Sequence, residues 1–206
     1  AIGYEAGKAM TTGEGNVAIG YQAGDAMTAT ANTVLIGQSA GGSINSTGAN
    51  GTVAIGYQAF EDLTSGGSNT ALGYRAGMNM TTGGNNVAIG YNSLVNAVDT
   101  CNSNIAIGSQ AMITVDRGTN GSATVNGNIA IGYNALAGGD FVDQDKDLVG
   151  NIAIGKNALD ATAANAQTGT IAIGHEALTA LTSGNKNIAI GYEAGKAMTT
   201  GEGNVA

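Results

Sequence analysis

Few residues of this chain are of a type that could do chemistry. His175 is the only histidine and Cys101 the only cysteine, so no Cys/His cluster with zinc-ligand spacing exists. No nucleophile stands beside a base at a motif spacing, and no phosphate-binding loop is visible. Because 35 of the 206 residues are glycine, isolated G-x-G matches carry no weight. We therefore predict that the chain is not an enzyme, and we assign no catalytic, cofactor-binding or metal-binding residues and no cofactor.

The acidic insert at 138–150, GGDFVDQDKDLVG, is the one stretch with a metal-like pattern. Asp143, Asp145 and Asp147 have the 1, 3, 5 spacing of calcium loops. Position 6 is Leu148 instead of glycine, and no glutamate stands at position 12. The calcium-binding G-G-x-G-x-D nonapeptide of other β-rolls is also absent. A solvated acidic loop is therefore favoured over a calcium site.

The tyrosines give the sharpest side-chain signal. All seven follow a recurring glycine directly, at Tyr4, Tyr21, Tyr57, Tyr74, Tyr91, Tyr133 and Tyr192. Gln38, Ser109, Lys156 and His175 occupy the same position elsewhere, so His175 is expected to act as a surface ring and not as a catalyst. Two interpretations stand: an aromatic strip for sugars or a host surface, and a structural ladder with packed rings and wet hydroxyls. The ladder is favoured.

Charge and composition exclude several classes of partner. The net charge of −8 disfavours nucleic acid and anionic membranes, which both select basic surfaces. No apolar run approaches the roughly 20 residues of a membrane span. Cys101 cannot form an internal disulfide, so we expect a small buried residue, with an interchain bridge as the alternative. Abundant glycine and alanine, with no proline or tryptophan, favour thin stacked layers over a thick core.

A repeat organises the whole chain. The glycine of a V-A-I-G-type motif recurs at Gly3, Gly20, Gly37, Gly56, Gly73, Gly90, Gly108, Gly132, Gly155, Gly174 and Gly191, which gives a base period of 17 residues. The stretch AIGYEAGKAMTTGEGNVA opens the chain and returns at its close, offset by 188 residues. We expect residues 1–206 to form one continuous array, cut from a longer tandem array with a 188-residue super-repeat.

Each motif reads as a strand that is apolar on both faces. In Val17-Ala18-Ile19 the two large side chains share one face and alanine takes the other. We expect the Val/Ile face to line the interior, so that aspartate at Ile89 or Ile131 would disrupt the fold. The alanine face, which admits little beyond a methyl group, is expected to contact a neighbouring chain. It comprises Ala18, Ala54, Ala71, Ala88, Ala106, Ala130, Ala153, Ala172 and Ala189, with Leu35 as an exception.

The rest of the repeat unit indicates corners and a second side. Apolar residues at +3, +4 and +7 from the glycine predict a short helical turn, and a second extended side is the alternative. Asn or Thr precedes each strand, as at Asn16, Thr33, Thr52, Asn86, Asn104, Asn151 and Asn187, and such residues can bond from rung to rung as ladders. The insert at 113–127 reads as a projecting hairpin.

The repeats NVAIGYQA and TTGGNNVAIGYNSL resemble the head repeats of trimeric autotransporter adhesins and, more closely, the repeat regions of phage tail fibres. The resemblance covers nearly the whole chain outside the inserts. It implies a left-handed parallel β-roll in a homotrimer, outside the cell or on a virion surface. The adhesin heads have shorter units, near fourteen residues, so the cross-section here is expected to differ.

The sequence thus predicts an all-β chain, a parallel β-solenoid (β-roll) of about ten 17-residue rungs. The function we expect is that of a structural subunit of a long extracellular fibre or filament that associates with itself, as a trimer by resemblance. The alternative is an adhesin or host-receptor-binding fibre that holds cell-surface glycans on the tyrosine strip or the inserted loops.

Overall fold

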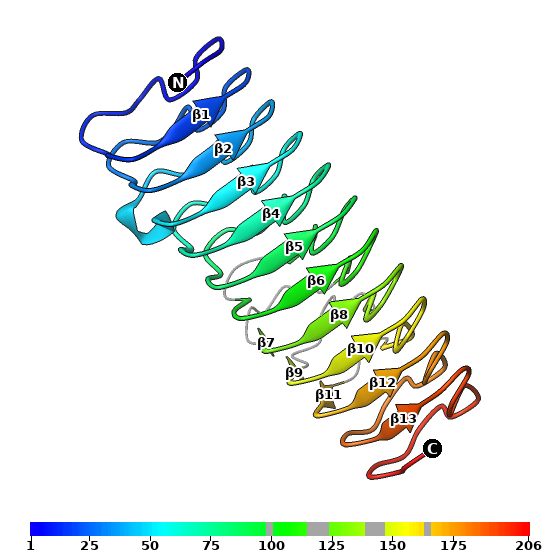
Figure 1. Ribbon diagram of the computed structural model, residues 1–206. Coiled ribbons are helices and arrows are strands. Elements are labelled where there is room, and N and C mark those ends of the chain that lie inside the picture. The colour runs from blue at the N-terminus through cyan, green and yellow to red at the C-terminus, as the bar shows by residue number, and fades with distance from the viewer. Residues whose placement is uncertain (98–100, 115–123, 139–146, 163–165) are drawn as a thin grey trace.

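The computed structural model describes the chain except for residues 98–100, 115–123, 139–146 and 163–165. Its main feature is one parallel sheet in which each strand comes from a successive coil, so the chain winds as a β-solenoid (Figure 1). The ten strands are β1 (Val17–Ile19), β2 (Val34–Ile36), β3 (Val53–Ile55), β4 (Thr70–Leu72), β5 (Val87–Ile89), β6 (Ile105–Ile107), β8 (Ile129–Ile131), β10 (Ile152–Ile154), β12 (Ile171–Ile173) and β13 (Ile188–Ile190). The predicted all-β parallel solenoid is confirmed.

The strands pair in perfect register along the motif. The central residue of each strand faces the central residue of the next, as Ala88 faces Ala106 and Ala106 faces Ala130. The insertions between motifs therefore leave the strands aligned in the sheet. Single bridges at Ile2 and Val205 continue the same pairing toward both ends of the chain.

A second, smaller parallel sheet lies at another side of the coils. It consists of β7 (Val125–Asn126), β9 (Leu148–Val149) and β11 (Gln167–Thr168). Both predicted inserts run into it, and most of the expected hairpin at 113–127 and of the acidic loop at 138–150 lies outside the described residues. Within the described part, the one helical element is the 3-10 helix η1 (Thr47–Ala49), which the Ser46 side chain caps.

The orientation predicted for the strands is wrong. The central alanines are inside the solenoid, with Ala88, Ala106 and Ala130 wholly buried, whereas the flanking Val and Ile residues point outward. The methyl-sized face does mark a close approach of another layer, but that layer is the opposite side of the same coil. The alanine face therefore cannot contact a second chain.

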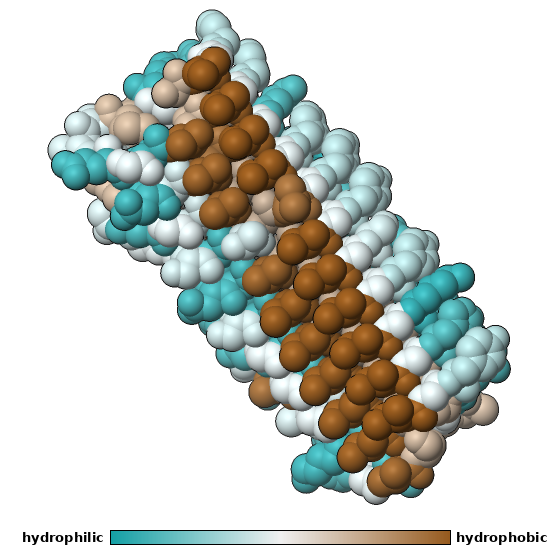
Figure 2. Space-filling model, viewed as in Figure 1, coloured by the Kyte–Doolittle hydropathy of each residue, from teal (hydrophilic) through white to brown (hydrophobic). Residues whose placement is uncertain are grey.

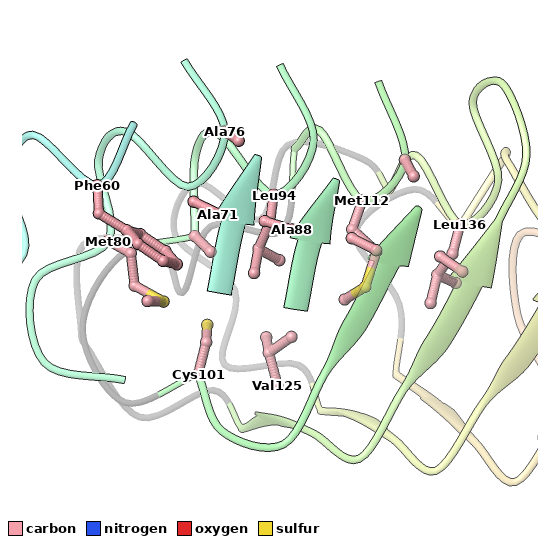
Figure 3. Close-up of a cluster of buried hydrophobic side chains, with 14 of the residues drawn as sticks. Phe60, Ala71, Ala76, Met80, Ala88, Leu94, Cys101, Met112, Val125 and Leu136 are labelled. Carbon is pink, nitrogen blue, oxygen red and sulfur yellow. The ribbon is translucent and has the colours of Figure 1, made fainter. Parts of the chain in front are cut away.

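The interior is thin, and neighbouring rungs compensate each other's volume. Leu35, the exception among the central alanines, fits because glycines stand opposite: a Cβ on Gly24 would lie 2.6 Å from Leu35 Cδ1, and one on Gly41 2.8 Å from Leu35 Cδ2. Leu94 and Met112 extend from the turn side into the core beneath the strands (Figure 3). Interior packing is therefore matched across several rungs at once.

The turn side is neither a helical turn nor a strand. After the motif glycine come two successive β-turns, closed by Ala23 N–H to Gly20 O at 3.4 Å and by Met27 N–H to Gly24 O at 3.1 Å. Gln22 and Gly24 adopt left-handed φ angles of 54° and 57°, and such alternation interrupts a helix. Backbone bonds between rungs, such as Gly24 N–H to Ala40 O at 2.9 Å, replace the bonds within a helix.

Some rungs carry a bulky residue at that strained left-handed position. Phe60 has a φ of 48° and Leu136 a φ of 47°, yet both side chains are wholly buried. A left-handed conformation costs a non-glycine residue about 1–2 kcal/mol. The burial of a large apolar side chain, at about 1.5–3 kcal/mol, offsets that strain.

The motif glycines stack one above another at a corner of the coil. Their φ angles are close to Gly132's 134°, and a Cβ on Gly132 would lie 2.6 Å from the carbonyl oxygen of Gly155 in the next rung. Only glycine satisfies both the backbone angle and the close contact. This column explains why the glycine is the most regular residue of the repeat.

Candidate functional site

A buried column of asparagines joins the rungs at the start of the strands, as predicted. From Asn69 through Asn86, Asn104 and Asn128 to Asn151, each side-chain amide donates to the Oδ1 of the preceding asparagine at 3.0–3.1 Å. Each amide also donates to a backbone carbonyl of the following rung, for example from Asn128 to Leu148 O at 2.7 Å. The column is fully buried, so its role is structural.

The tyrosines form the predicted ladder on the outer surface. Ring centroids lie 5.1 Å apart for Tyr57 and Tyr74 and 5.3 Å apart for Tyr74 and Tyr91, with the rings within 14° of parallel. The Arg75 guanidinium lies 5.2 Å from the centroid of Tyr74, close enough for a cation–π contact. Within a stack each ring thus covers one face of its neighbour, and the outer faces of the rings at the ends of a stack have no ring against them.

His175 also behaves as predicted. Its ring stacks on Tyr192 at 5.2 Å and 9°, so it takes a tyrosine's place in the ladder. Cys101 is wholly buried and is not part of a disulfide, which agrees with the first of the two predictions made for it.

One charged cluster was not foreseen from the sequence. His175, Glu176 and Glu193 bring ligand-type atoms within 4.8 Å of one another, and no other such group occurs among the described residues. Lys196 Nζ lies between the carboxylates, 2.6 Å from Glu176 Oε2 and 3.0 Å from Glu193 Oε1. The lysine thus supplies the positive charge that the pair of glutamates attracts.

The electrostatics of the cluster follow from this geometry. The hydrogen bond from Lys196 is the main reason that the pKa values of Glu176 and Glu193 lie below 4.5. The same contacts raise the pKa of Lys196. Nearby Asp160 has a raised pKa because it is partly buried and because Glu176 repels its charged form. The cluster is therefore a surface ion-pair network that spans two rungs. Glu176 and Glu193 are 17 residues apart, which is one base period, and this spacing is the sequence signal that could have revealed the cluster.

Figure 2 shows an apolar stripe that runs along the large sheet. We define the Val/Ile stripe as the first and third residues of each of the ten strands, from Val17 and Ile19 to Ile188 and Ile190. Every position except Thr70 is Val, Ile or Leu, and no charged residue interrupts it. Leu72 is 46% exposed and Ile190, in the last strand, is 60% exposed, whereas most other positions of the stripe are half-buried. Sequence analysis missed the exposure of this stripe because it assigned these side chains to the interior.

The Val/Ile stripe and the tyrosine ladder thus lie on one regular scaffold. The molecule is a tandem-repeat β-solenoid with an apolar sheet face and an aromatic edge. No family model, curated protein or solved structure matches the chain. In the described part of the chain, no helix has the length and apolar character needed to cross a membrane.

Proposed function

We propose that the chain is a structural subunit of a long extracellular fibre or filament, and that copies associate through the Val/Ile stripe. The exposed stripe is the observation that carries this proposal. The resemblance to tail-fibre and adhesin repeats supports a homotrimer and a location on a cell or virion surface. The proposed contact replaces the one predicted through the alanine face.

The size of the stripe supports an interface. Ten strands at about 4.8 Å spacing extend about 43 Å, and two rows of side chains are about 10 Å wide, so the stripe covers roughly 400 Å². Apolar patches of about 300–600 Å² are the largest that typical monomers expose, and they are often functional. Because the patch here is also straight and free of charge, covering it is favourable.

A second copy of the chain is the partner that fits best. The side-chain rows recur at the spacing of the strands, so another copy presents rows with the same period. An apolar partner without that period would match only a few rungs. The absence of charge on the stripe removes any repulsion between identical faces, although the chain as a whole carries a charge of −8.

The test uses charge placed on each face of the strands. The double variant Ile107→Asp/Ile131→Asp should stay folded by circular dichroism and run as a monomer in sedimentation velocity, whereas the wild type should run as an oligomer. Ala106→Asp places a charge in the interior and should unfold the surrounding rungs. Asn45→Asp, at an exposed site away from the stripe, is the matched control and should leave the oligomer intact. A monomeric wild type, or an oligomer unaffected by the double substitution, would refute the proposal.

A further inference from the structure

The tyrosine ladder has interruptions, and one of them places a short side chain between two rings. Gln38 separates Tyr21 from Tyr57, and Lys156 separates Tyr133 from His175. Both have long side chains that can lie across a ring, as the Arg75 guanidinium does over Tyr74. Ser109, between Tyr91 and Tyr133, ends at a single hydroxyl group.

The backbone around Ser109 is as regular as elsewhere, so the missing ring does not close the gap. Strands β5, β6 and β8 pair in register, with Ile89 opposite Ile107 and Ile107 opposite Ile131. Gln110 N–H donates to Tyr91 O at 2.9 Å, and Asn134 N–H donates to Ser109 O at 3.2 Å. Tyr91 and Tyr133 therefore stand two rungs apart, with Ser109 and no ring at the ladder position between them; we call this position the Ser109 slot.

The width of this slot follows from the ladder itself. Adjacent rings are 5.1–5.3 Å apart, so two steps place the centroids of Tyr91 and Tyr133 about 10 Å apart. Tyr91 stacks on Tyr74 with its other face and is 52% exposed, and Tyr133 is 47% exposed. The slot thus has room for one six-membered ring, with an aromatic face on each side.

We propose that the Ser109 slot binds a pyranose ring of the gluco type, with equatorial hydroxyl groups. Such a sugar has two apolar C–H faces, which suit the two tyrosine rings, and a polar rim. The rim would meet water, the Ser109 hydroxyl and the neighbouring Gln110 amide at the open edge of the slot. An axial hydroxyl group would stand against one of the tyrosine faces, so galacto and manno sugars fit less well. The inference concerns a single chain and does not depend on the proposed fibre.

The chain offers matched variants for the test. Ser109→Tyr inserts the residue that seven other rungs carry, so it should fold normally while filling the slot. Gln38→Ser should open a second slot between Tyr21 and Tyr57. Tyr91→Ala removes one wall of the site. Circular dichroism on each variant establishes that the fold is kept.

The measurement is saturation-transfer NMR on the purified chain with methyl β-glucopyranoside, and with the methyl galactoside, methyl mannoside and p-cresol as comparison probes. We expect weak binding of the glucoside, at least about tenfold reduced signal in the Ser109→Tyr and Tyr91→Ala variants, and an increased signal with Gln38→Ser. No transfer to the glucoside, or equal transfer in the Ser109→Tyr variant, would refute the site. Binding of p-cresol alone would refute the assignment to a sugar, because the slot would then select a flat aromatic ring.

Discussion

Replacement of one buried asparagine by alanine should locally destabilise the solenoid. In Asn128→Ala, four hydrogen bonds disappear: the Asn128 amide no longer donates to Asn104 Oδ1 or Leu148 O, and its Oδ1 no longer accepts from the Asn151 backbone and side-chain N–H groups. At about 1 kcal/mol net for each bond, the loss is about 4 kcal/mol. Water cannot restore these bonds while the rungs stay stacked, because the side chain is wholly buried.

The assay must be local, because stacked rungs need not unfold as one unit. Hydrogen exchange at the backbone amide of Asn151 reports directly on the lost acceptor, and about 4 kcal/mol corresponds to roughly 800-fold faster exchange through local opening. The exposed Asn45 provides the control, and Asn45→Ala should leave exchange in these rungs unchanged. Exchange at Asn151 within about fivefold of the wild type would refute the claim that the column holds the rungs together.

Three further predictions concern other contacts. Gly132→Ala should strongly destabilise the coil, measured by thermal melting, because its Cβ would lie 2.6 Å from the next rung's carbonyl; unchanged melting would contradict the stacked corner. Leu35→Ala should lower the free energy of unfolding by about 2–5 kcal/mol. Gly24→Ala should destabilise the wild type, and it should destabilise the Leu35→Ala variant less. Simple additivity in a double-mutant cycle would show that the two residues do not share the space. Glu176→Gln should lower the melting temperature at pH 7. Because the pKa of Glu176 is depressed in the folded chain, its contribution to stability is present above about pH 4.5 and is lost as the pH falls through the folded pKa. A difference in melting temperature from the wild type that persists at pH 3 would contradict the role of the Lys196 contact.

The sequence was sufficient for the parts of the fold that repeat. The glycine period predicts the rungs, and the Asn/Thr and Tyr columns follow because a residue that recurs once per rung stacks on its own copies. Which face of each strand points into the solenoid did not follow from the repeat. Both faces of Val87-Ala88-Ile89 are apolar, so hydrophobicity alone cannot decide which face is inside.

The deciding information was what already fills the interior. The turn side contributes large, wholly buried side chains such as Phe60, Leu94 and Met112. The strands can then add little more than a methyl group, and their large Val and Ile side chains must face outward. The helical turn was mispredicted for a related reason, because residues at +3, +4 and +7 also share one side in consecutive β-turns whose left-handed residues no hydrophobic pattern reveals.

The glycine column also has a consequence for how such a chain can change over generations. Each rung offers its neighbours the same carbonyl edge and the same amide edge, so a recombination event that adds or deletes whole rungs preserves the backbone hydrogen bonds between rungs. Length is then a freely adjustable trait, and the identical stretches at 1–18 and 189–206 would be suitable crossover points. The exceptions are joints where one rung's bulk depends on its neighbour, as Phe60 depends on Gly77, whose added Cβ would collide with the ring. Such pairs should be inherited together, which makes them natural borders between blocks that can be shuffled.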